Sequence, residues 1–205
     1  MEEDDDDRQM VTHVLDSFAF HRFVEGFSPI ASYNAVRAEI GQIVEPMMAR
    51  AWTLGEIPGV EIGDEFVYRE QIRLVGLHRD LIRGISTTLH GNGQEVAACV
   101  VANYADHNNL AGDDVYVYGG DGGKLIMAHR SNLGVLNHQL LENGNQAMVN
   151  SIAVGNTIHL LARLVMEDAT RRYVFLGFFR VTGFGVVQSN NGFNVFEFFL
   201  ERDEV

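Results

Sequence analysis

The sequence predicts an α+β fold in which two helices precede a curved sheet or barrel. Beyond Gly55, short β-prone runs alternate with polar breaks, which is typical of a sheet built from many short strands. Apolar residues at helical spacing are confined to the N-terminal part of the chain and to one later segment. This small share of helix argues against a parallel sheet in which strands and helices alternate.

Two segments precede the predicted sheet. Residues 1–7 are almost all acidic and are expected to form a disordered tail. Residues 8–54 are expected to form a helical brace, because apolar residues recur at helical spacing on both sides of the Ser28-Pro29 step. The second helix is expected to start near Ser32, and Pro46 is expected to kink or end it. The simplest role for two amphipathic helices in front of a sheet is to pack against it.

Residues 55–205 are predicted to form the sheet domain. Within it, residues 133–150 have the apolar spacing of a helix. Phenylalanine and tyrosine crowd the last third of the chain, where they are interpreted as core and sheet face. The β-prone runs are Glu65–Leu74, Glu95–Ala102, Asp114–Tyr118, Thr157–Met166, Arg172–Val181 and Phe193–Glu201.

The chain has 205 residues, 46% of them hydrophobic, which is enough to bury the core of one globular domain. No apolar run reaches membrane-spanning length, so a membrane is not expected among its partners. Residues 2–7 are acidic, which does not fit a signal peptide. The single cysteine, Cys99, lies in an apolar run and indicates a buried thiol in a reducing compartment.

The formal net charge of −13 is unfavourable for a nucleic-acid-binding protein, because neutralising phosphate supplies much of the affinity of such proteins. Among the 15 basic residues, Lys124 is the one lysine and the others are arginines. Any contact with DNA would therefore depend on arginines gathered locally against an adverse overall field.

Residues 103–123 hold the most informative pattern. Two β-prone runs flank a polar loop, and the second run ends in a glycine block, residues 119–123, that is interrupted by Asp121. Glycine lets a backbone approach a ligand closely and adopt positive φ. Tyr104 and Tyr118 would each end a strand beside the loop. The residues fit two interpretations: a pocket in which two rings and a carboxylate hold a planar guest, or a hairpin with a long glycine-rich turn.

The sequence does not indicate an enzyme or a metal site. The histidines lack the paired spacing with cysteine or carboxylates that is typical of zinc or catalytic centres, and His78 is interpreted as structural. No spacing of serine, histidine and aspartate, or of cysteine and histidine, suggests a hydrolase. We therefore expect no cofactor, no bound metal and no catalytic residues.

Several blocks of residues occur in an order that resembles the SRA domain (SET- and RING-associated, also called YDG). Residues 104–123 resemble the family's Tyr-Glu-Asp-Asp…Gly-Asp…Tyr-Thr-Gly-x-Gly-Gly block. The two leading helices resemble those that precede the SRA domain of plant histone methyltransferases. The resemblance covers about residues 55–202, and its blocks are residues 58–64, 75–79, 84–85, 104–123, 138–141, 144–151 and 175–181.

The resemblance implies a crescent-shaped, barrel-like sheet with flanking helices, and a protein that recognises 5-methylcytosine in double-stranded DNA by base flipping. The flipped base would stack between Tyr104 and Tyr118, with backbone groups around Gly119 and a carboxylate at its Watson–Crick edge. A base can be inspected on all sides only outside the stack, and its extrusion costs a few kcal/mol. Aromatic stacking contributes about 1–3 kcal/mol per base toward that cost.

Two loops would contact the DNA according to the resemblance. Ile82 matches the family position that fills the vacated space in the stack, and Arg83 lies beside it for phosphate. In the second loop, within residues 124–136, Arg130 is the expected contact. The implied setting is chromatin or epigenetic regulation in the nucleus, with chromatin proteins as further partners.

The sequence departs from the family pattern at the base pocket. The family places its base-reading Asp three residues after the first Tyr, where this chain has His107, and Asp106 lies one residue earlier. Three alternatives remain open: Asp106 contacts the base from a shifted loop, His107 takes its place, or neither contacts the base. Asn103 stands where the family has Gly, and Leu176-Gly177 replaces its Asp-Gly.

Three functions are compatible with these residues. The first is a non-catalytic module that recognises methylated DNA. The second is a degenerate SRA fold that serves as a protein-interaction module without recognising the methylated base, which His107, Asn103 and the net charge of −13 favour. The last is a modification-dependent nuclease, which would need a carboxylate cluster for metal and a part of the chain to hold it.

Overall fold

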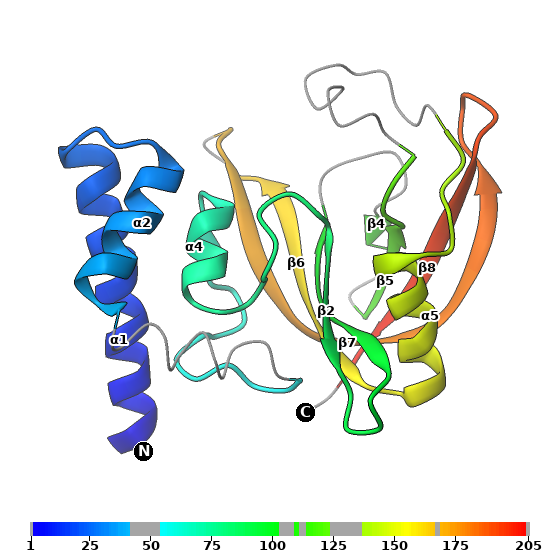
Figure 1. Ribbon diagram of the computed structural model, residues 1–205, viewed down its shortest axis with the longest axis horizontal. Coiled ribbons are helices and arrows are strands. Elements are labelled where there is room, and N and C mark those ends of the chain that lie inside the picture. The colour runs from blue at the N-terminus through cyan, green and yellow to red at the C-terminus, as the bar shows by residue number, and fades with distance from the viewer. Residues whose placement is uncertain are drawn as a thin grey trace.

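The computed structural model of the chain describes residues 2–41, 54–102, 109–110, 114–123, 137–166 and 169–203. It consists of an N-terminal group of helices beside a sheet domain (Figure 1). The helical elements are α1 (Glu2–Ala19), the π-helical turn η1 (Phe20–Val24), α2 (Pro29–Glu39), α4 (Arg69–Leu74) and α5 (Asn143–Val154). The strands are β1 (Glu65–Phe66), β2 (Ile85–Leu89), β3 (Glu95–Ala102), β4 (Asn109–Leu110), β5 (Val115–Gly119), β6 (Thr157–Val165), β7 (Arg171–Gln188) and β8 (Asn194–Arg202).

The described strands form one open, eight-stranded sheet. Its order is β2-β3-β6-β7-β8-β5-β4, and β1 pairs with β7. Neighbouring strands are antiparallel except for β3 and β6, which are parallel. The predicted α+β class with a curved sheet is confirmed. The sheet is not closed into a barrel by strand pairing, because β2 and β4 stand at the two ends of the path through the described strands.

The long strand β7 contributes to the curvature of the sheet. One part of it pairs with β6 and an overlapping part with β8, and each pairing contains a register shift, at Leu160/Leu161 and at Val181/Gly183. Such irregularities bend a strand and increase its twist. Gly177 of β7 has a φ of 104°, a conformation that L side chains rarely adopt. Figure 1 shows β7 and β8 bending together away from the N-terminal helices.

The curvature brings the start of β2 close to the end of β5, although β3, β6, β7 and β8 separate them in the sheet. The amide of Ile85, the first residue of β2, donates a hydrogen bond of 3.2 Å to Oδ2 of Asp121, which follows β5. A side chain therefore bridges two sides of the sheet that strand pairing leaves apart.

Helix α5 packs over the inner face of the sheet. The Oγ of its buried Ser151 accepts a hydrogen bond of 3.0 Å from the Ala97 amide of β3, which fixes the helix against that strand. The helix ends at Gly155, which has a left-handed φ of 72°. The buried core beneath α5 includes Ile85, Val100, Tyr116, Tyr118, Met148, Leu160, Phe179 and Phe198.

Helices α1 and α2 pack against α4, which connects them to the sheet. Phe18 of α1, Tyr33 of α2 and Leu74 of α4 are buried in one apolar cluster. A second cluster joins Val11 of α1 to the sheet and includes Cys99, whose thiol pKa is raised by burial. The cysteine is therefore an inert core residue at neutral pH.

The N-terminal elements differ from the sequence expectations at two points. Helix α1 begins at Glu2, so residues 2–7 belong to a helix rather than to a disordered tail. The positive end of the helix dipole favours acidic residues there. Helix α2 begins at Pro29 rather than near Ser32, because the Ser28 Oγ caps it by accepting a 3.3 Å hydrogen bond from the Ala31 amide.

The expected strand over Glu65–Leu74 is wrong beyond Phe66. The Gln71 side chain accepts hydrogen bonds of 2.9 and 3.0 Å from the amides of Val67 and Tyr68, and these contacts begin helix α4. Strand β2 was not expected, since its sequence, Ile-Ser-Thr-Thr-Leu, is largely polar. Helix α5 spans Asn143–Val154, so the helix expected over residues 133–150 is wrong for residues 137–142, and residues 124–136 lie outside the described residues.

The N-terminal helix is also fixed to the turn before β1. The Arg8 guanidinium donates two hydrogen bonds to the Asp64 carboxylate, of 2.6 and 2.8 Å, and a third of 3.0 Å to the Gly59 carbonyl. Gly59 has a φ of 74°, and a Cβ there would collide with the backbone of Asp7. The close approach of α1 to this turn therefore requires glycine at position 59.

We predict that Gly59→Ala destabilises the protein by more than about 1 kcal/mol, because alanine adds strain at a positive φ and a collision with α1. The loss should lower the melting temperature by at least about 2–4 °C, measured by thermal unfolding. Gly91→Ala is the matched control, since Gly91 is exposed and a Cβ there meets nothing within 4 Å. It should change stability by less than about 0.5 kcal/mol. Equal melting temperatures for the two variants would contradict the packing described.

Candidate nucleic-acid interface

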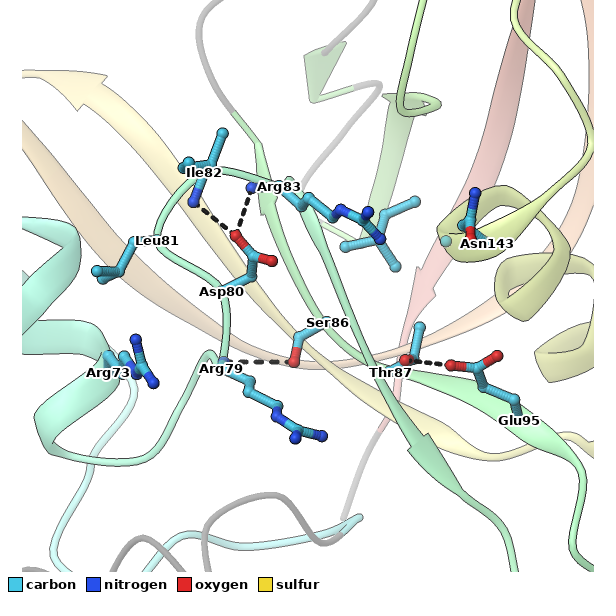
Figure 2. A pocket seen from close by; sticks show the side chains of 12 residues that line it. Arg73, Arg79, Asp80, Leu81, Ile82, Arg83, Ser86, Thr87, Glu95 and Asn143 are labelled. Carbon is cyan, nitrogen blue, oxygen red and sulfur yellow. Dashed lines mark hydrogen bonds between the residues drawn. The ribbon is translucent and has the colours of Figure 1, made fainter. Parts of the chain in front are cut away.

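The 79–84 loop, between α4 and β2, holds an apolar side chain in solvent. Ile82 at its tip is 70% exposed. The Oδ1 of Asp80 accepts hydrogen bonds from the amides of Ile82, at 2.7 Å, and Arg83, at 2.8 Å (Figure 2). Burial would raise the pKa of Asp80, but these two hydrogen bonds help to hold it below its ordinary value. The carboxylate therefore stays ionised and fixes the turn that carries Ile82.

The His78 ring contacts the backbone near both ends of the 79–84 loop. Its ring is 2% exposed, with Nδ1 2.7 Å from the Asp80 carbonyl oxygen and Nε2 3.3 Å from the Gly84 carbonyl oxygen. Burial, with the nearby positive charge of Arg69, lowers the pKa of His78 to about 4. The ring is therefore neutral at physiological pH and has the structural role expected from the sequence.

Several other backbone groups of the loop also have partners. The Arg69 guanidinium donates a 2.5 Å hydrogen bond to the Arg83 carbonyl, and the Val101 amide of β3 donates one of 2.7 Å to the Gly84 carbonyl. At the start of the loop, the Arg79 amide donates to the Ser86 Oγ at 3.3 Å. Paired backbone groups do not need water, so the loop is held in one conformation from several sides.

A hollow of about 500 Å³ lies beside the loop and gathers positive charge. Arg73, Arg79 and Arg83 are among its lining residues and surround Asp80 in Figure 2. The hollow is lined by two carboxylates, those of Asp80 and Glu95, and the Glu95 carboxylate accepts a 2.6 Å hydrogen bond from the Thr87 hydroxyl. In a chain with a net charge of −13, this is the local gathering of arginines that contact with phosphate would need.

Tyr118, at the end of β5, is part of the core. Its side chain is 3% exposed, and its hydroxyl donates a 2.9 Å hydrogen bond to Oδ1 of Asp121. Burial raises the pKa of both Tyr118 and Asp121 above their ordinary values. Gly119 is paired with Glu197 of β8. The tyrosine and the glycine block are thus fixed to the sheet.

Two buried amide side chains hold the glycine block, residues 119–123. The Asn145 side chain accepts a 2.8 Å hydrogen bond from the Asp121 amide and donates one of 2.9 Å to the Asp121 carbonyl. Gln139 donates to the Gly120 carbonyl at 2.5 Å and accepts from the Phe196 amide at 2.8 Å. A Cβ at Gly120 would lie 2.6 Å from Oδ1 of Asn145, so this position has no space for a side chain.

The structure describes only part of the predicted site. Tyr118 and Gly119 lie at the end of β5, and Ile82 and Arg83 lie in the 79–84 loop. Tyr104, Asp106, His107, Asn103 and Arg130 lie outside the described residues. The described members are brought together through Asp121, which contacts both Tyr118 and the first residue of β2.

Sequence reasoning missed the residues that support the site. Asp80, Arg69 and Asp121 each satisfy backbone groups or a hydroxyl near the loop. Asp121 occupies the unspecified position of the family's Tyr-Thr-Gly-x-Gly-Gly block, so the pattern carries no signal for it. Residues 138–141 and 144–151 are blocks that resemble the SRA family. Within these blocks, Gln139 and Asn145 form the hydrogen bonds that hold the glycine block.

The described residues contain no group of three or more histidine, cysteine, aspartate or glutamate side chains placed to hold a metal ion. No helix in the described ranges is long and apolar enough to cross a membrane.

Known proteins share this sequence pattern. A family model described as the SAD/SRA domain matches residues 53–204. "Histone-lysine N-methyltransferase family member SUVH9" of Arabidopsis thaliana is 33% identical over 156 residues, which make up 74% of this chain and 23% of that protein. The chain therefore spans about a quarter of the length of this relative.

Solved structures share the fold. The SUVH5 SRA structure in complex with fully methylated CG DNA is 31% identical and has a TM-score of 0.63, with 75% of this chain and 95% of that chain covered. The structure of KRYPTONITE in complex with mCHG DNA and SAH has a TM-score of 0.80, with 96% of this chain and 44% of that chain covered. Its identity of 21% supports a shared fold that extends over the N-terminal helices.

We predict that Asp80→Ala loosens the 79–84 loop without unfolding the protein. Each lost hydrogen bond to the carboxylate should speed amide hydrogen exchange at Ile82 and Arg83 by at least about tenfold. Asn92→Ala is the matched control, because the Asn92 side chain accepts a 2.9 Å hydrogen bond from the Gln94 amide in the β2–β3 turn. It should speed exchange at Gln94 and leave the loop unchanged. Native exchange rates at Ile82 and Arg83 in Asp80→Ala would show that other contacts fix the loop.

Proposed function

The chain belongs to the SAD/SRA domain family, and from this premise we propose that it is a non-catalytic module that binds methylated double-stranded DNA and recognises 5-methylcytosine by base flipping. The observation that carries the proposal is the 79–84 loop, in which the Asp80 carboxylate accepts hydrogen bonds from the backbone on both sides of an exposed isoleucine tip, and three arginines line the same hollow. The SUVH5 SRA domain, 31% identical, was solved with methylated DNA, which supports the same class of partner.

The exposed side chain of Ile82 suits insertion into a duplex. Extruding a base leaves an apolar gap between its neighbours, and proteins that deform DNA fill such gaps with apolar side chains. Ile82 is 70% exposed on a loop that is already ordered, so little conformational entropy would be lost when it enters the stack. Single exposed apolar side chains are common on proteins, so the case for insertion rests on the position of Ile82 at the tip of a hydrogen-bonded loop that carries arginines.

Arginines beside the loop supply the contacts to phosphate. Arg83 follows Ile82 directly, and Arg73 and Arg79 line the adjacent hollow. Arginine binds phosphate with a planar fork of donors and stays charged at all physiological pH values. Because the chain as a whole carries −13, we expect binding to depend on these few contacts and to weaken steeply with salt.

The base itself is assigned to Tyr104, Tyr118 and Gly119, with Asp106 or His107 at its polar edge. Tyr118 is 3% exposed in the free chain, so stacking of a base on its ring requires neighbouring residues to move aside when the base enters. A nuclear location, a role in chromatin or epigenetic regulation and contacts with chromatin proteins belong to the same proposal. The name of the relative from Arabidopsis thaliana, a histone-lysine N-methyltransferase family member, supports them.

A protein-interaction module without base recognition is the second candidate. An apolar patch on the N-terminal helices favours it, since Phe20, Phe23 and Val24 are 51%, 64% and 71% exposed. Exposed apolar clusters of this kind often mark protein contacts. This candidate differs from the first in one measurable respect, because it predicts equal binding to methylated and unmethylated DNA.

We predict that the chain binds a duplex with 5-methylcytosine more tightly than the unmethylated duplex of the same sequence, in titrations at low and moderate salt. Ile82→Ala should weaken binding to the methylated duplex by about 5- to 30-fold, which corresponds to about 1–2 kcal/mol of lost apolar contact. Leu89→Ala is the matched control, since Leu89 is 71% exposed at the far end of β2 and should be neutral.

Asp106→Ala should reduce the preference for the methylated duplex if that carboxylate contacts the base, and His107→Ala should do so if the imidazole replaces it. Equal binding of the unaltered chain to both duplexes, at both salt concentrations, would contradict base recognition. Tyr118→Ala is a poor test, because the ring is buried in the core and its removal would leave a cavity.

A further inference from the structure

We propose that Asp121 is a positioning residue that couples insertion of the Ile82 loop to placement of the base against Tyr118. The proposal rests on the function proposed above and adds a residue to it. Asp121 does not need to touch DNA in this role. In this role its carboxylate forms hydrogen bonds at the same time to Tyr118 and to Ile85, the residue that follows the Ile82 loop.

The two carboxylate oxygens of Asp121 reach two different segments. Oδ1 accepts the 2.9 Å hydrogen bond from the Tyr118 hydroxyl, and Oδ2 accepts the 3.2 Å hydrogen bond from the Ile85 amide. Tyr118 is the next-to-last residue of β5, whereas Ile85 is the residue at which the 79–84 loop enters β2. Strand pairing does not connect β2 to β5 in the described sheet, so this carboxylate is a direct link between them.

Gly84 makes the link tight. A Cβ at position 84 would collide with the Tyr118 hydroxyl and would lie 2.6 Å from Oδ1 of Asp121. The last residue of the loop is therefore packed directly on the phenol group and the carboxylate, with no side chain between them. A shift of the loop must displace the tyrosine, and a shift of the tyrosine must displace the loop.

The aspartate is itself immobile. Its amide and carbonyl are both bound to the Asn145 side chain, at 2.8 and 2.9 Å, and Asn145 is 2% exposed on α5. The backbone of Asp121 is therefore fixed to α5, and its carboxylate is held by its own hydrogen bonds to Tyr118 and Ile85. Through its hydrogen bonds to the Ile85 amide and the Tyr118 hydroxyl, Asp121 therefore ties the position of the loop to the position of the tyrosine ring.

The positioning role depends on the geometry of the Asp121 side chain and does not require its charge. Burial raises the pKa of Asp121, which shows that the ionised form is destabilised in its surroundings. A neutral amide could join a hydroxyl to a backbone amide without that cost.

The test is a thermodynamic cycle between Ile82→Ala and methylation of the duplex. In the unaltered chain, we expect Ile82→Ala to weaken binding to the methylated duplex at least about fivefold more than binding to the unmethylated duplex, because the loop and the base act together. In Asp121→Ala, the two effects of Ile82→Ala should agree within about twofold. Unchanged coupling in Asp121→Ala would overturn the proposal.

Asp121→Asn separates a positioning role from an effect of charge. Its amide can accept from the Ile85 amide and donate to the Tyr118 oxygen, so the coupling should be restored while the charge is absent. Loss of coupling in Asp121→Asn as complete as in Asp121→Ala would overturn the proposed link.

If Asp121→Ala does not fold, Tyr118→Phe takes its place, because it removes the hydroxyl that donates to Asp121 and keeps the ring. It should abolish the coupling.

Asp203→Ala is the matched control for loss of a buried carboxylate. The Asp203 side chain is 10% exposed and accepts hydrogen bonds from Thr157, at 2.5 Å, and Arg180, at 2.8 Å, both remote from the loop. It should lower the melting temperature and leave the coupling intact. Failure of the unaltered chain to distinguish the duplexes would contradict the proposed function itself, whereas intact discrimination with unchanged coupling in Asp121→Ala would contradict only the role of Asp121.

Discussion

The hydrogen bonding of the 79–84 loop is the constraint on which the rest of the site depends. An apolar side chain in water favours collapse onto the nearest surface, and a short loop with free backbone groups would allow it. Asp80, Arg69 and Asp121 pair with the backbone of the loop and of the residue that follows it, and Ile82 remains 70% exposed. The loop is thus ordered during folding, so its conformational entropy is lost before any partner binds.

The fold explains how three distant segments meet at this loop. Bulges in the pairings of β7 curve the sheet until the end of β5 approaches the start of β2. Helix α4, which carries Arg69, is packed between the N-terminal helices and the sheet. The N-terminal helices therefore influence the loop indirectly, because they hold the helix from which Arg69 reaches the Arg83 carbonyl.

The sequence predicted the elements with clear periodicity and missed those set by side-chain hydrogen bonds. Strands β3, β5, β6, β7 and β8 lie where apolar alternation or apolar runs placed them. Strand β2 was missed because its serine and threonines resemble a loop, and α4 was misassigned because the Gln71 contacts that begin it are not visible in hydrophobicity. Family resemblance indicated Ile82 and Tyr118 as candidate site residues, but the contacts of a buried carboxylate such as Asp121 depend on three-dimensional neighbours that no local pattern encodes.

The claim that the loop is ordered before binding can be tested on the free protein. Backbone ¹⁵N order parameters of residues 80–84, measured by NMR relaxation, should be about 0.85, the value of rigid backbone. They should match the values in strand β2, into which the loop continues. Order parameters below about 0.6 for Ile82 and Arg83 would mean that the loop is mobile until it meets a partner, and would contradict a loop that is ordered during folding.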